Sequence, residues 1–486
     1  MATEMQTITE IIAAGAPMTL EQIIKLEIDD FKRSDSLKLM QVGQKYYSAD
    51  NEILKRKREV IGEGARLVED KNISNHKLVH AFIRKLVDQK VGYLLSKPIS
   101  IQTDKEAYGK ALGEIFDKSF LRKLKILGKD AINKGRSWLH PYYDDKGQFS
   151  LKMIPAEEGI PLWKDAEHTE LDAFIRFYDV EYYEGMNKRL ITKVEFWDTT
   201  GVKRYTLDAV MAPGLVPDTD GPISHFSALG EDGNEEPLNW ERVPFICFKY
   251  NDEELPLIKI IQSLIDDYDL QTSDNSNNLT DLPNGIHVLK NYDGTDLGEF
   301  RRNLALYRAV KVTDEGGVDT LNLELNPEAL KVHIEQLRKD IYEFGRGVDT
   351  QSDKIGSSPS GIALKFLYAD LDMDANGIET EFQASLEQLL WFVDQHLANT
   401  GIGDFSEEQV EFIFNRDILI NETETITNAK NSSGIISDET IMVNHPWVTD
   451  VKEEQRRMDE QAAEPDPYAN NKPGGGSTPV DGVGNT

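Results

Sequence analysis

The chain has 486 residues, of which 85 are acidic and 54 are basic, so its formal net charge at pH 7 is -31. This length provides material for about three domains and excludes a small scaffold held together by disulfides. A single cysteine, Cys247, excludes an intramolecular disulfide and supplies too little sulfur for a zinc or iron–sulfur site. The acidic balance disfavours general binding to nucleic acid or to anionic lipid.

The charge is unevenly distributed along the chain. Residues 1–150 contain 26 basic and 21 acidic side chains, and the remaining residues contain 28 basic and 64 acidic ones. The N-terminal third is therefore electrostatically distinct from the rest. Its basic clusters, Lys55–Arg58 and Arg122–Lys125, resemble solvated surfaces or protein contacts more than DNA sites, because acidic residues flank them.

The N-terminus lacks the pattern of a secretory leader. Glu4 and Glu10 lie where a signal peptide would carry Lys or Arg. No apolar run in the sequence approaches the length of about 18 residues that a membrane span requires. We therefore expect a protein that is made and used outside the secretory route and has no membrane partner.

Helical periodicity dominates the N-terminal region. Residues 19–33 begin with a capping box formed by Thr19 and Gln22 and carry an apolar stripe. A stronger stripe runs over residues 75–95, and a further helical stretch covers 105–134. These patterns predict amphipathic helices in all three places.

The pattern changes at Trp138, where short runs of aromatic and β-branched residues begin to alternate with turn sequences. They predict an antiparallel β region with strands at 138–143, 148–154, 171–183, 189–198, 203–210 and 243–250. Residues 211–240 are rich in Gly, Pro, Asp and Glu and are too long for a tight connection, so they predict a mobile surface loop.

After Asp252 the pattern is helical, but the apolar stripe of the first half gives way to polar residues from Gln271 to Asp281. Such a segment is unlike an ordinary core helix, and we expect it to leave the globular body. A small α/β insert is predicted next, with strands near 285–290, 308–313 and 318–325 around a helix near 296–307. A second helix, over 326–349, then returns.

The polar stretch 351–360, in which Ile355 is the one large side chain, predicts a flexible loop. Residues 361–399 predict a very long helix that is interrupted at Gly377, where helix propensity is weakest. A strand near 409–414 and helices to about residue 462 follow. The end of the chain is rich in Pro, Gly and Asn and is expected to be disordered.

One motif resembles a calcium loop. The sequence Asp372-Met-Asp374-Ala-Asn376-Gly377 matches the first six positions, but Gln383 replaces the bidentate Glu at the twelfth. Polar positions at a bend in a long helix are the simpler interpretation. A calcium-binding interaction protein is the alternative that this motif leaves open.

Other patterns argue against catalysis. His76 and His80 have the spacing of a zincin pair, but Lys77 occupies the place of the catalytic Glu, so we expect two partly exposed helix histidines. The acidic run that begins at Asp266 spreads around a helix and does not converge on one ion. Phosphate-binding, dinucleotide-binding and nucleophile-elbow motifs are missing from the sequence. The sequence therefore predicts a non-enzyme without a cofactor or bound metal; a cytosolic multidomain metal-dependent hydrolase is the alternative.

Two stretches resemble signature segments of the portal proteins of tailed bacteriophages. They are Lys-Leu-Val-Asp-Gln-Lys-Val-Gly-Tyr-Leu-Leu-Ser-Lys-Pro at 85–98 and Ser-Gly-Ile-Ala-Leu-Lys-Phe-Leu-Tyr-Ala-Asp-Leu-Asp at 360–372. The order of elements over about 20–462 resembles that of the siphophage-type portal family. The resemblance implies an α+β portal fold with a mixed α/β wing, long stem helices, a small α/β clip and a helical crown. The implied boundaries are the wing at 1–250, a stem helix at 251–281, the clip at 282–325, a second stem helix at 326–350, the tunnel loop at 351–360, a long kinked helix and wing strand at 361–417, the crown at 418–462 and a disordered tail at 463–486.

The same resemblance implies a homo-oligomeric ring of about 12 copies at one vertex of the capsid. Double-stranded DNA would pass through this ring during packaging and ejection, and the polar half of the first stem helix would meet neighbouring subunits and water. The implied protein partners are the terminase large subunit, the major capsid and scaffold proteins and a head–tail adaptor. Assembly would take place in the host cytoplasm.

The tunnel loop carries the predicted site. Its DNA-facing residues would be Gln351, Ser352, Asp353, Lys354, Ile355, Gly356, Ser357, Ser358, Pro359 and Ser360. Lys354 is the one cation of this loop, and we hypothesise that it makes transient contacts with DNA phosphates.

Overall fold

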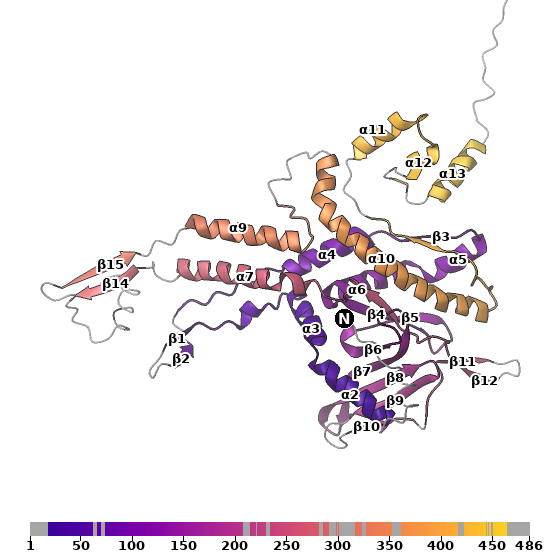
Figure 1. Ribbon diagram of the computed structural model, residues 1–486, viewed down its shortest axis with the longest axis horizontal. Helices are drawn as coiled ribbons and strands as arrows, with labels where there is room; N and C mark the ends of the chain where they lie inside the picture. The colour runs from indigo at the N-terminus through magenta and orange to yellow at the C-terminus, as the bar shows by residue number, and fades with distance from the viewer. Residues whose placement is uncertain are drawn as a thin grey trace, which may run out of the picture. The chain divides into compact units, whose positions relative to one another are not determined.

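The computed structural model describes residues 18–61, 66–69, 73–207, 214–219, 221–229, 234–280, 285–290, 298, 300, 316–322, 327–351, 361–416, 422–443, 445, 447–448 and 451–463. The chain divides into two compact units. The first consists of Met1–Ser358 and Lys365–Asp417, and the second consists of Pro359–Leu364 and Ile418–Thr486. Figure 1 shows the elements of both units.

The first described elements of the first unit are two consecutive helices, α2 (Leu20–Arg33) and α3 (Asp35–Tyr47). The predicted capping box of α2 is confirmed, because Gln22 N–H donates to Thr19 Oγ1 over 3.4 Å and Thr19 N–H donates to Gln22 Oε1 over 3.0 Å. Ser34 separates the helices and caps the second one. The helix α3 was not predicted.

Three further helices follow: α4 (Phe82–Leu95), α5 (Glu106–Ile115) and α6 (Lys118–Lys134). The prediction of one helix over 75–95 was wrong in its first part, because side chains of a later helix, at residues 269–277, accept backbone N–H groups of the residues before α4. The helical stretch 105–134 consists of two helices, since Asp117 caps a new one through a hydrogen bond from Phe120 N–H.

The predicted antiparallel β region is confirmed. It forms a three-stranded sheet in the order β13-β4-β5 and a five-stranded sheet in the order β10-β9-β8-β7-β6. The strands are β4 (Arg136–Tyr143), β5 (Phe149–Ile154), β6 (Gly159–Trp163), β7 (Leu171–Glu184), β8 (Asn187–Asp198), β9 (Gly201–Leu207), β10 (Leu215–Pro217) and β13 (Ile246–Lys249). Residues 211–240 are not one irregular loop, because they contain β10 and the paired strands β11 (Phe226–Leu229) and β12 (Glu235–Leu238).

Short elements complete the first unit. The described residues include two 3-10 helices, η1 (Glu52–Lys55) and η3 (Ala156–Glu158). Two small antiparallel pairs join β1 (Glu59–Ile61) to β2 (Leu67–Glu69) and β3 (Ser100–Gln102) to β16 (Glu411–Ile413). The strand β16 lies within the strand predicted near 409–414.

Two antiparallel helices, α7 (Ile258–Thr280) and α9 (Pro327–Phe344), lie side by side and extend from the sheets and helices of the first unit (Figure 1). Between them in the chain, β14 (Gly285–Lys290) pairs with β15 (Gly317–Asn322). The departing and returning helices and two of the three insert strands therefore agree with the predictions. The expected helix near 296–307 and the strand near 308–313 lie outside the described residues, apart from positions 298 and 300.

One long helix, α10 (Gly361–Asn399), crosses the core. It continues through Gly377 as a single helix, so the predicted interruption is wrong as a break in secondary structure. Phe382 of this helix is buried in the larger hydrophobic cluster together with Leu86 and Ile261. A second cluster packs against the five-stranded sheet, where the rings of Phe174 and Phe245 stack with centroids 3.9 Å apart.

The second unit contains three short helices: α11 (Glu422–Ser432), α12 (Asp438–Val443) and α13 (Val451–Ala463). They agree with the helices predicted up to about residue 462. The expected disordered tail at 463–486 lies outside the described residues apart from Ala463. A search of the described helices of both units finds none with the length and apolar character that a membrane crossing requires.

Candidate functional site

The predicted DNA-facing loop lies between α9 and α10. Gln351 is described, whereas 352–360, including Lys354, lie outside the described residues. The chain reaches Gln351 through a turn after α9 and resumes with α10 at Gly361. The described candidate site is therefore the anchor of this loop, which we define as residues 345–351 and their contacts.

The helix α9 ends in a Schellman cap. Arg346 N–H donates to the Glu343 carbonyl over 3.0 Å, and Gly347 N–H donates to the Tyr342 carbonyl over 2.8 Å. Arg346 occupies the left-handed position of this cap, with φ of 48°, where glycine is usual. The chain thus keeps a long side chain at a position where glycine would be conformationally easier.

Two glycines bring this turn against α4. A Cβ atom on Gly347 would lie 2.1 Å from Leu86 Cδ2, and one on Gly345 would lie 2.8 Å from Leu86 Cδ1 and 2.5 Å from the Ile341 carbonyl oxygen. Leu86 is fully buried and cannot easily move away. The turn is therefore held in direct contact with α4.

Gln89 of α4 binds the backbone of the anchor at Val348. Its Nε2 donates to the Val348 carbonyl over 3.1 Å, and its Oε1 accepts from Val348 N–H over 2.9 Å. Two opposed hydrogen bonds from one side chain fix both the distance and the orientation of this peptide segment.

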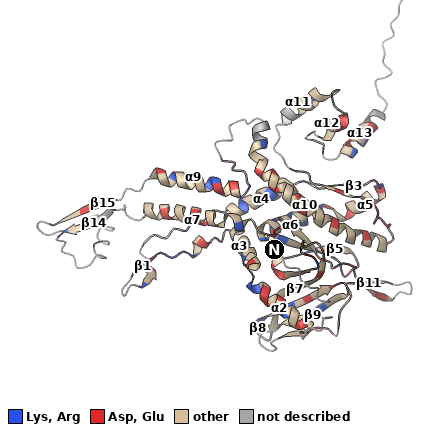
Figure 2. Cartoon of the chain, viewed as in Figure 1, with Lys and Arg blue, Asp and Glu red and all other residues tan. Residues whose placement is uncertain are grey.

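Arg338 of α9 fixes the end of the anchor. Its Nε and one terminal nitrogen donate to the two oxygens of Asp349 over 2.9 and 2.8 Å, and that terminal nitrogen also donates to Gln351 Oε1 over 3.1 Å. Burial alone would raise the pKa of Asp349, but the hydrogen bond from Arg338 contributes to holding it below its ordinary value. A bidentate pair of this kind restrains orientation as well as distance. The first residue of the predicted loop is therefore tied to α9, on which acidic and basic residues alternate (Figure 2).

Lys90 of α4 is buried, with 1% of its surface exposed, and lies between the anchor and α10. Its Nζ donates to Asp374 Oδ2 over 2.7 Å and to the Arg346 carbonyl over 3.1 Å. Asp374 also accepts from the Tyr250 hydroxyl, over 3.1 Å to Oδ2, and lies 3.6 Å from a terminal nitrogen of Arg346. Burial lowers the pKa of Lys90, and the charge of Asp374 opposes this shift.

The two segments that carry the family resemblance meet next to this network. The Tyr93 hydroxyl of α4 donates to Asp372 of α10 over 3.0 Å, and the rings of Tyr93 and Tyr368 stack with centroids 6.0 Å apart. Arg416 also donates to Asp372. The calcium-like motif therefore lies within a continuous helix, and its two carboxylates, Asp372 and Asp374, are paired with Arg416 and Lys90. The described residues contain no group of three or more His, Cys, Asp or Glu side chains arranged to hold a metal.

The polar half of α7 has a structural role that the sequence interpretation missed. Residues 76–80 run extended along it, and alternate backbone N–H groups donate to a buried stripe of α7 side chains. The pairs are His80 with Asp269 at 3.0 Å, Leu78 with Ser273 at 2.9 Å and His76 with Asn277 at 2.7 Å. Four residues of an α-helix rise about 6.0 Å along the helix axis. Two residues of extended chain span about 6.6 Å, so every second N–H of the segment meets every fourth residue of α7. This face of α7 is covered by its own chain, and Asp269, Ser273 and Asn277 are fully buried.

The extended course of residues 76–80 corrects the placement of the two histidines. Neither lies on a helix. His80 Nδ1 lies 2.7 Å from Asp269 Oδ1, and His76 Nε2 lies 2.9 Å from Thr280 Oγ1. Both rings complete the contact between this segment and α7, and their spacing has no relation to that of a metal pair.

The basic clusters are also engaged within the protein. Arg56 donates to Asp274 of α7 over 2.6 Å. Lys123 donates to the Leu151 carbonyl over 2.8 Å, and Lys125 donates to the Ser96 carbonyl over 3.1 Å. Three cations of the two clusters therefore contact other parts of their own chain.

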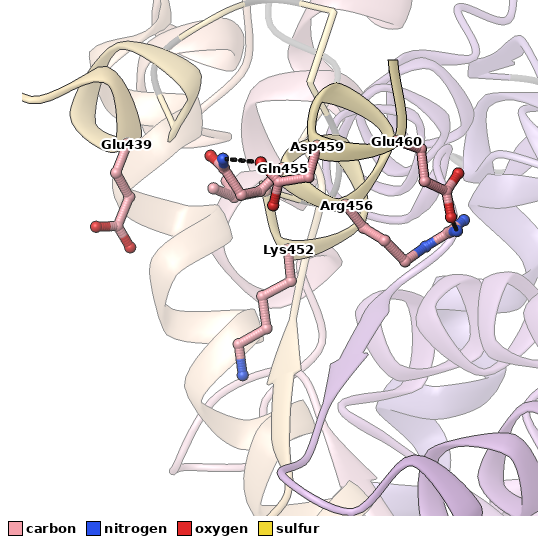
Figure 3. A pocket seen from close by; sticks show the side chains of 7 residues that line it. Glu439, Lys452, Gln455, Arg456, Asp459 and Glu460 are labelled. Carbon is pink, nitrogen blue, oxygen red and sulfur yellow. Dashed lines mark hydrogen bonds and ion pairs between the residues drawn. The ribbon is translucent and has the colours of Figure 1, made fainter. Parts of the chain in front are cut away.

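A pocket of about 750 Å³ in the second unit offers no comparable site. Its lining comes from Glu439 of α12 and from α13 (Figure 3). On α13, Gln455 donates to Asp459 over 3.2 Å and Arg456 pairs with Glu460. These are contacts between neighbouring turns of an exposed helix, and they leave no group of side chains directed at a common ligand.

Sequence reasoning missed the residues that anchor the loop. Lys90 occupies a position of α4 that lies among apolar residues, and this is a signal of a buried charge with a partner. The pair Gly345 and Gly347 at the end of a helical pattern signals a tight cap. Arg338 and Asp349 carry no distinctive pattern, because surface pairs of this kind are frequent in any charged helix.

Comparisons with known proteins agree with the resemblance found in the sequence. The family described as "Phage portal protein, SPP1 Gp6-like" matches residues 30–468. The portal protein of Bacillus phage SPP1 is 31% identical over 466 residues, which cover 94% of this chain and 90% of the relative. The portal protein of Clostridium phage phiCD119 is 30% identical over 457 residues, which cover 90% of this chain and 95% of the relative. A chain from a solved structure of the neck of an empty GTA particle aligns with a TM-score of 0.41 and 12% identity, covering 75% of this chain and 89% of that one.

Proposed function

Because this chain belongs to the SPP1 Gp6-like family of phage portal proteins, we propose that it forms a closed ring at one vertex of a phage capsid. Double-stranded DNA enters the capsid through this ring during packaging and leaves through it during ejection. A ring of identical subunits requires two complementary faces on each subunit, so that every copy contacts its neighbours in the same way. About 12 copies close the ring in the virion.

We assign the parts of the ring from the order of elements. The helices α7 and α9 form the stem, the insert that contains β14 and β15 forms the clip, and α11 to α13 belong to the crown. The elements before α7, together with β16, form the wing. Residues 351–360 form the tunnel loop, and the anchor holds the start of this loop against α4 and α9.

The observation that carries the proposal is the extent of the family match. It spans residues 30–468 and therefore includes both stem helices, the insert between them, the anchor and α10. The formal charge of -31 per chain supports a conduit rather than a clamp. Duplex DNA carries one negative charge per about 1.7 Å, so an acidic channel wall repels it and provides no strong resting site.

The ring itself performs no catalysis and needs no cofactor. The chain has no phosphate-binding motif, so the energy for DNA movement comes from a separate terminase, whose large subunit docks on the clip. The head–tail adaptor docks on the same ring after packaging, and the major capsid and scaffold proteins surround it during assembly in the host cytoplasm. Within the loop, Lys354 makes transient contacts with DNA phosphates.

Packaging in vitro tests this function. Purified rings are incorporated into empty capsids and supplied with terminase, ATP and linear duplex DNA, and the DNA protected from nuclease is measured. We expect protection with the ring and none without it, and no ATP turnover by the ring alone. Packaging that proceeds equally without this protein would contradict the proposal.

A further inference from the structure

We infer that Lys90 is a positioning residue for the DNA-facing loop. It joins the turn that leads into that loop to α4 and α10, since it binds the Arg346 carbonyl in the turn after α9 and Asp374, 13 residues beyond the start of α10. The inference rests on the proposed function, because it concerns the place from which the loop reaches the channel. It goes beyond that function by assigning the task to a buried residue that touches no DNA.

The network around Lys90 joins distant segments. Asp374 lies 284 residues from Lys90 in the sequence, and Tyr250, which also donates to Asp374, follows β13. Arg346 takes part through both its carbonyl and its side chain. A single buried charge therefore fixes α4, α10 and the turn relative to one another, and each of its hydrogen bonds is directional.

Stability alone does not account for this arrangement. Removing a lysine and a carboxylate from water is unfavourable, and apolar residues of similar volume often stabilise a fold as well as a buried ion pair does. The better attested role of such a pair is to select one register between packed elements. Around Lys90, the elements whose register is selected are those that enter and leave the loop.

The backbone conformation of the turn supports the same role for the network. Arg346 adopts a left-handed backbone, which non-glycine residues rarely occupy, and it does so between two glycines. Glycine at this position would relieve the backbone but would remove the guanidinium that lies 3.6 Å from Asp374. A local strain that keeps a side chain in a network is typical of a functional constraint.

The effect on the loop follows from chain closure. The network holds the turn at Arg346, and five residues later the anchor ends at Gln351, where the predicted loop begins. Releasing one end increases the range of positions that a loop of fixed length can sample. Loss of the network should therefore alter DNA passage without preventing the fold or the ring.

A triple variant, Lys90→Met with Asp374→Leu and Tyr250→Phe, tests the inference, because it removes the buried charges and the hydroxyl of the network together. The Arg346 carbonyl then loses its Lys90 donor, which is the contact that the experiment is meant to remove. A matched control, Lys134→Met with Glu157→Leu and Asp130→Asn, removes another buried lysine together with its two carboxylate partners, which lie 3.0 and 3.5 Å from Lys134 Nζ. We expect both variants to form rings and to keep the melting temperature of the parent. The rate of amide hydrogen exchange at residues 346–351 should rise about fivefold or more in the triple variant and stay unchanged in the control. Fivefold is the lower end of the coupling that is typical between two sites.

The same rings are then compared in packaging. We expect DNA protected per capsid to fall about fivefold or more for the triple variant, with the control equal to the parent. Parent-like exchange and parent-like packaging in a well-folded triple variant would overturn the inference. If the parent ring itself supports no packaging, the proposed function fails instead, and the exchange experiment still decides whether the network holds the anchor.

Discussion

Asp269 accepts the backbone N–H of His80 over 3.0 Å through the same oxygen that lies 2.7 Å from His80 Nδ1. Its second oxygen accepts from Asn51 Nδ2 over 2.6 Å, and the carboxylate is fully buried. This carboxylate therefore joins α7 to two segments from the N-terminal part of the chain. A polar stripe on a helix that projects from the core can serve as a binding surface for its own chain.

Replacing Asp269 with Ala should destabilise the first unit. Three donors would lose their acceptor, and each buried donor left unpaired costs about 1–3 kcal/mol. The control is Asp267→Ala on the same helix, since that carboxylate is partly exposed and pairs with the exposed His333 over 3.2 Å. Its loss should change the free energy of unfolding by less than about 1 kcal/mol. Denaturant unfolding of both variants distinguishes the outcomes, and equal effects would contradict the account of the stripe.

Replacing Lys90 with Met alone should destabilise the protein more than the triple replacement does. The single change leaves Asp374 buried without its main cation, and breaking a buried pair in this way costs about 3–5 kcal/mol. Removing the carboxylate and the hydroxyl as well restores most of this loss. Thermal unfolding of the single, double and triple variants measures the coupling, and additive effects would show that the groups do not act as one network.

Replacing Gly347 with Ala should also be destabilising. The new methyl group would overlap Leu86 Cδ2, which lies 2.1 Å from the Cβ position, and overpacking of this kind costs about 1–3 kcal/mol. Gly113→Ala is the matched control, because this glycine lies in α5 with open space around its Cβ position. Alanine there should stabilise the helix by about 0.5–1 kcal/mol. Opposite signs in denaturant unfolding are expected, and a stabilising Gly347→Ala would contradict the close contact with α4.

Asp394 should impose a pH dependence on stability. Burial raises its pKa to about 6, although the Tyr108 hydroxyl donates to it over 2.6 Å and opposes the shift. A carboxyl group with a raised pKa binds its proton more tightly in the folded state, so its contribution to stability is lost as the pH rises from about 4 to 6. Asp394→Asn cannot lose a proton. Its melting temperature relative to the parent should therefore increase over this interval and then level off.

The control for this pH profile is Asp145→Asn, because Asp145 is exposed in a turn. Its difference from the parent should stay constant between pH 4 and 8, an interval chosen to extend about two units above the pKa of Asp394. A constant difference for Asp394→Asn as well would show that this carboxyl group titrates normally.

Elements stabilised by local interactions were predictable from the sequence. The helix α2 carries its capping box and its apolar stripe within a few residues, and the strands β7 and β8 form a simple hairpin. Residues 76–80 have helical spacing but become extended, because their partners on α7 lie 189 to 201 residues away. Local periodicity contains no information about such a partner.

In the candidate site, too, local features were predictable from the sequence and long-range contacts were not. The sequence patterns on either side of 351–360 were sufficient to predict the two helices that flank this segment. Residues 352–360 themselves lie outside the described residues, so the loop stays a prediction. The anchor was not predictable, because Lys90 and Asp374 are 284 residues apart and each alone resembles an ordinary helix residue. The contacts of Lys90 with α10 and with the turn after α9 are visible only in the folded chain.

The central claim is that this chain closes into a ring that conducts DNA. Native mass spectrometry of the protein, purified after co-expression with its capsid and scaffold proteins, tests it most directly. The account predicts a closed ring of about 12 copies of the 55.0 kDa chain. A protein that remains a monomer or dimer under these conditions would contradict it.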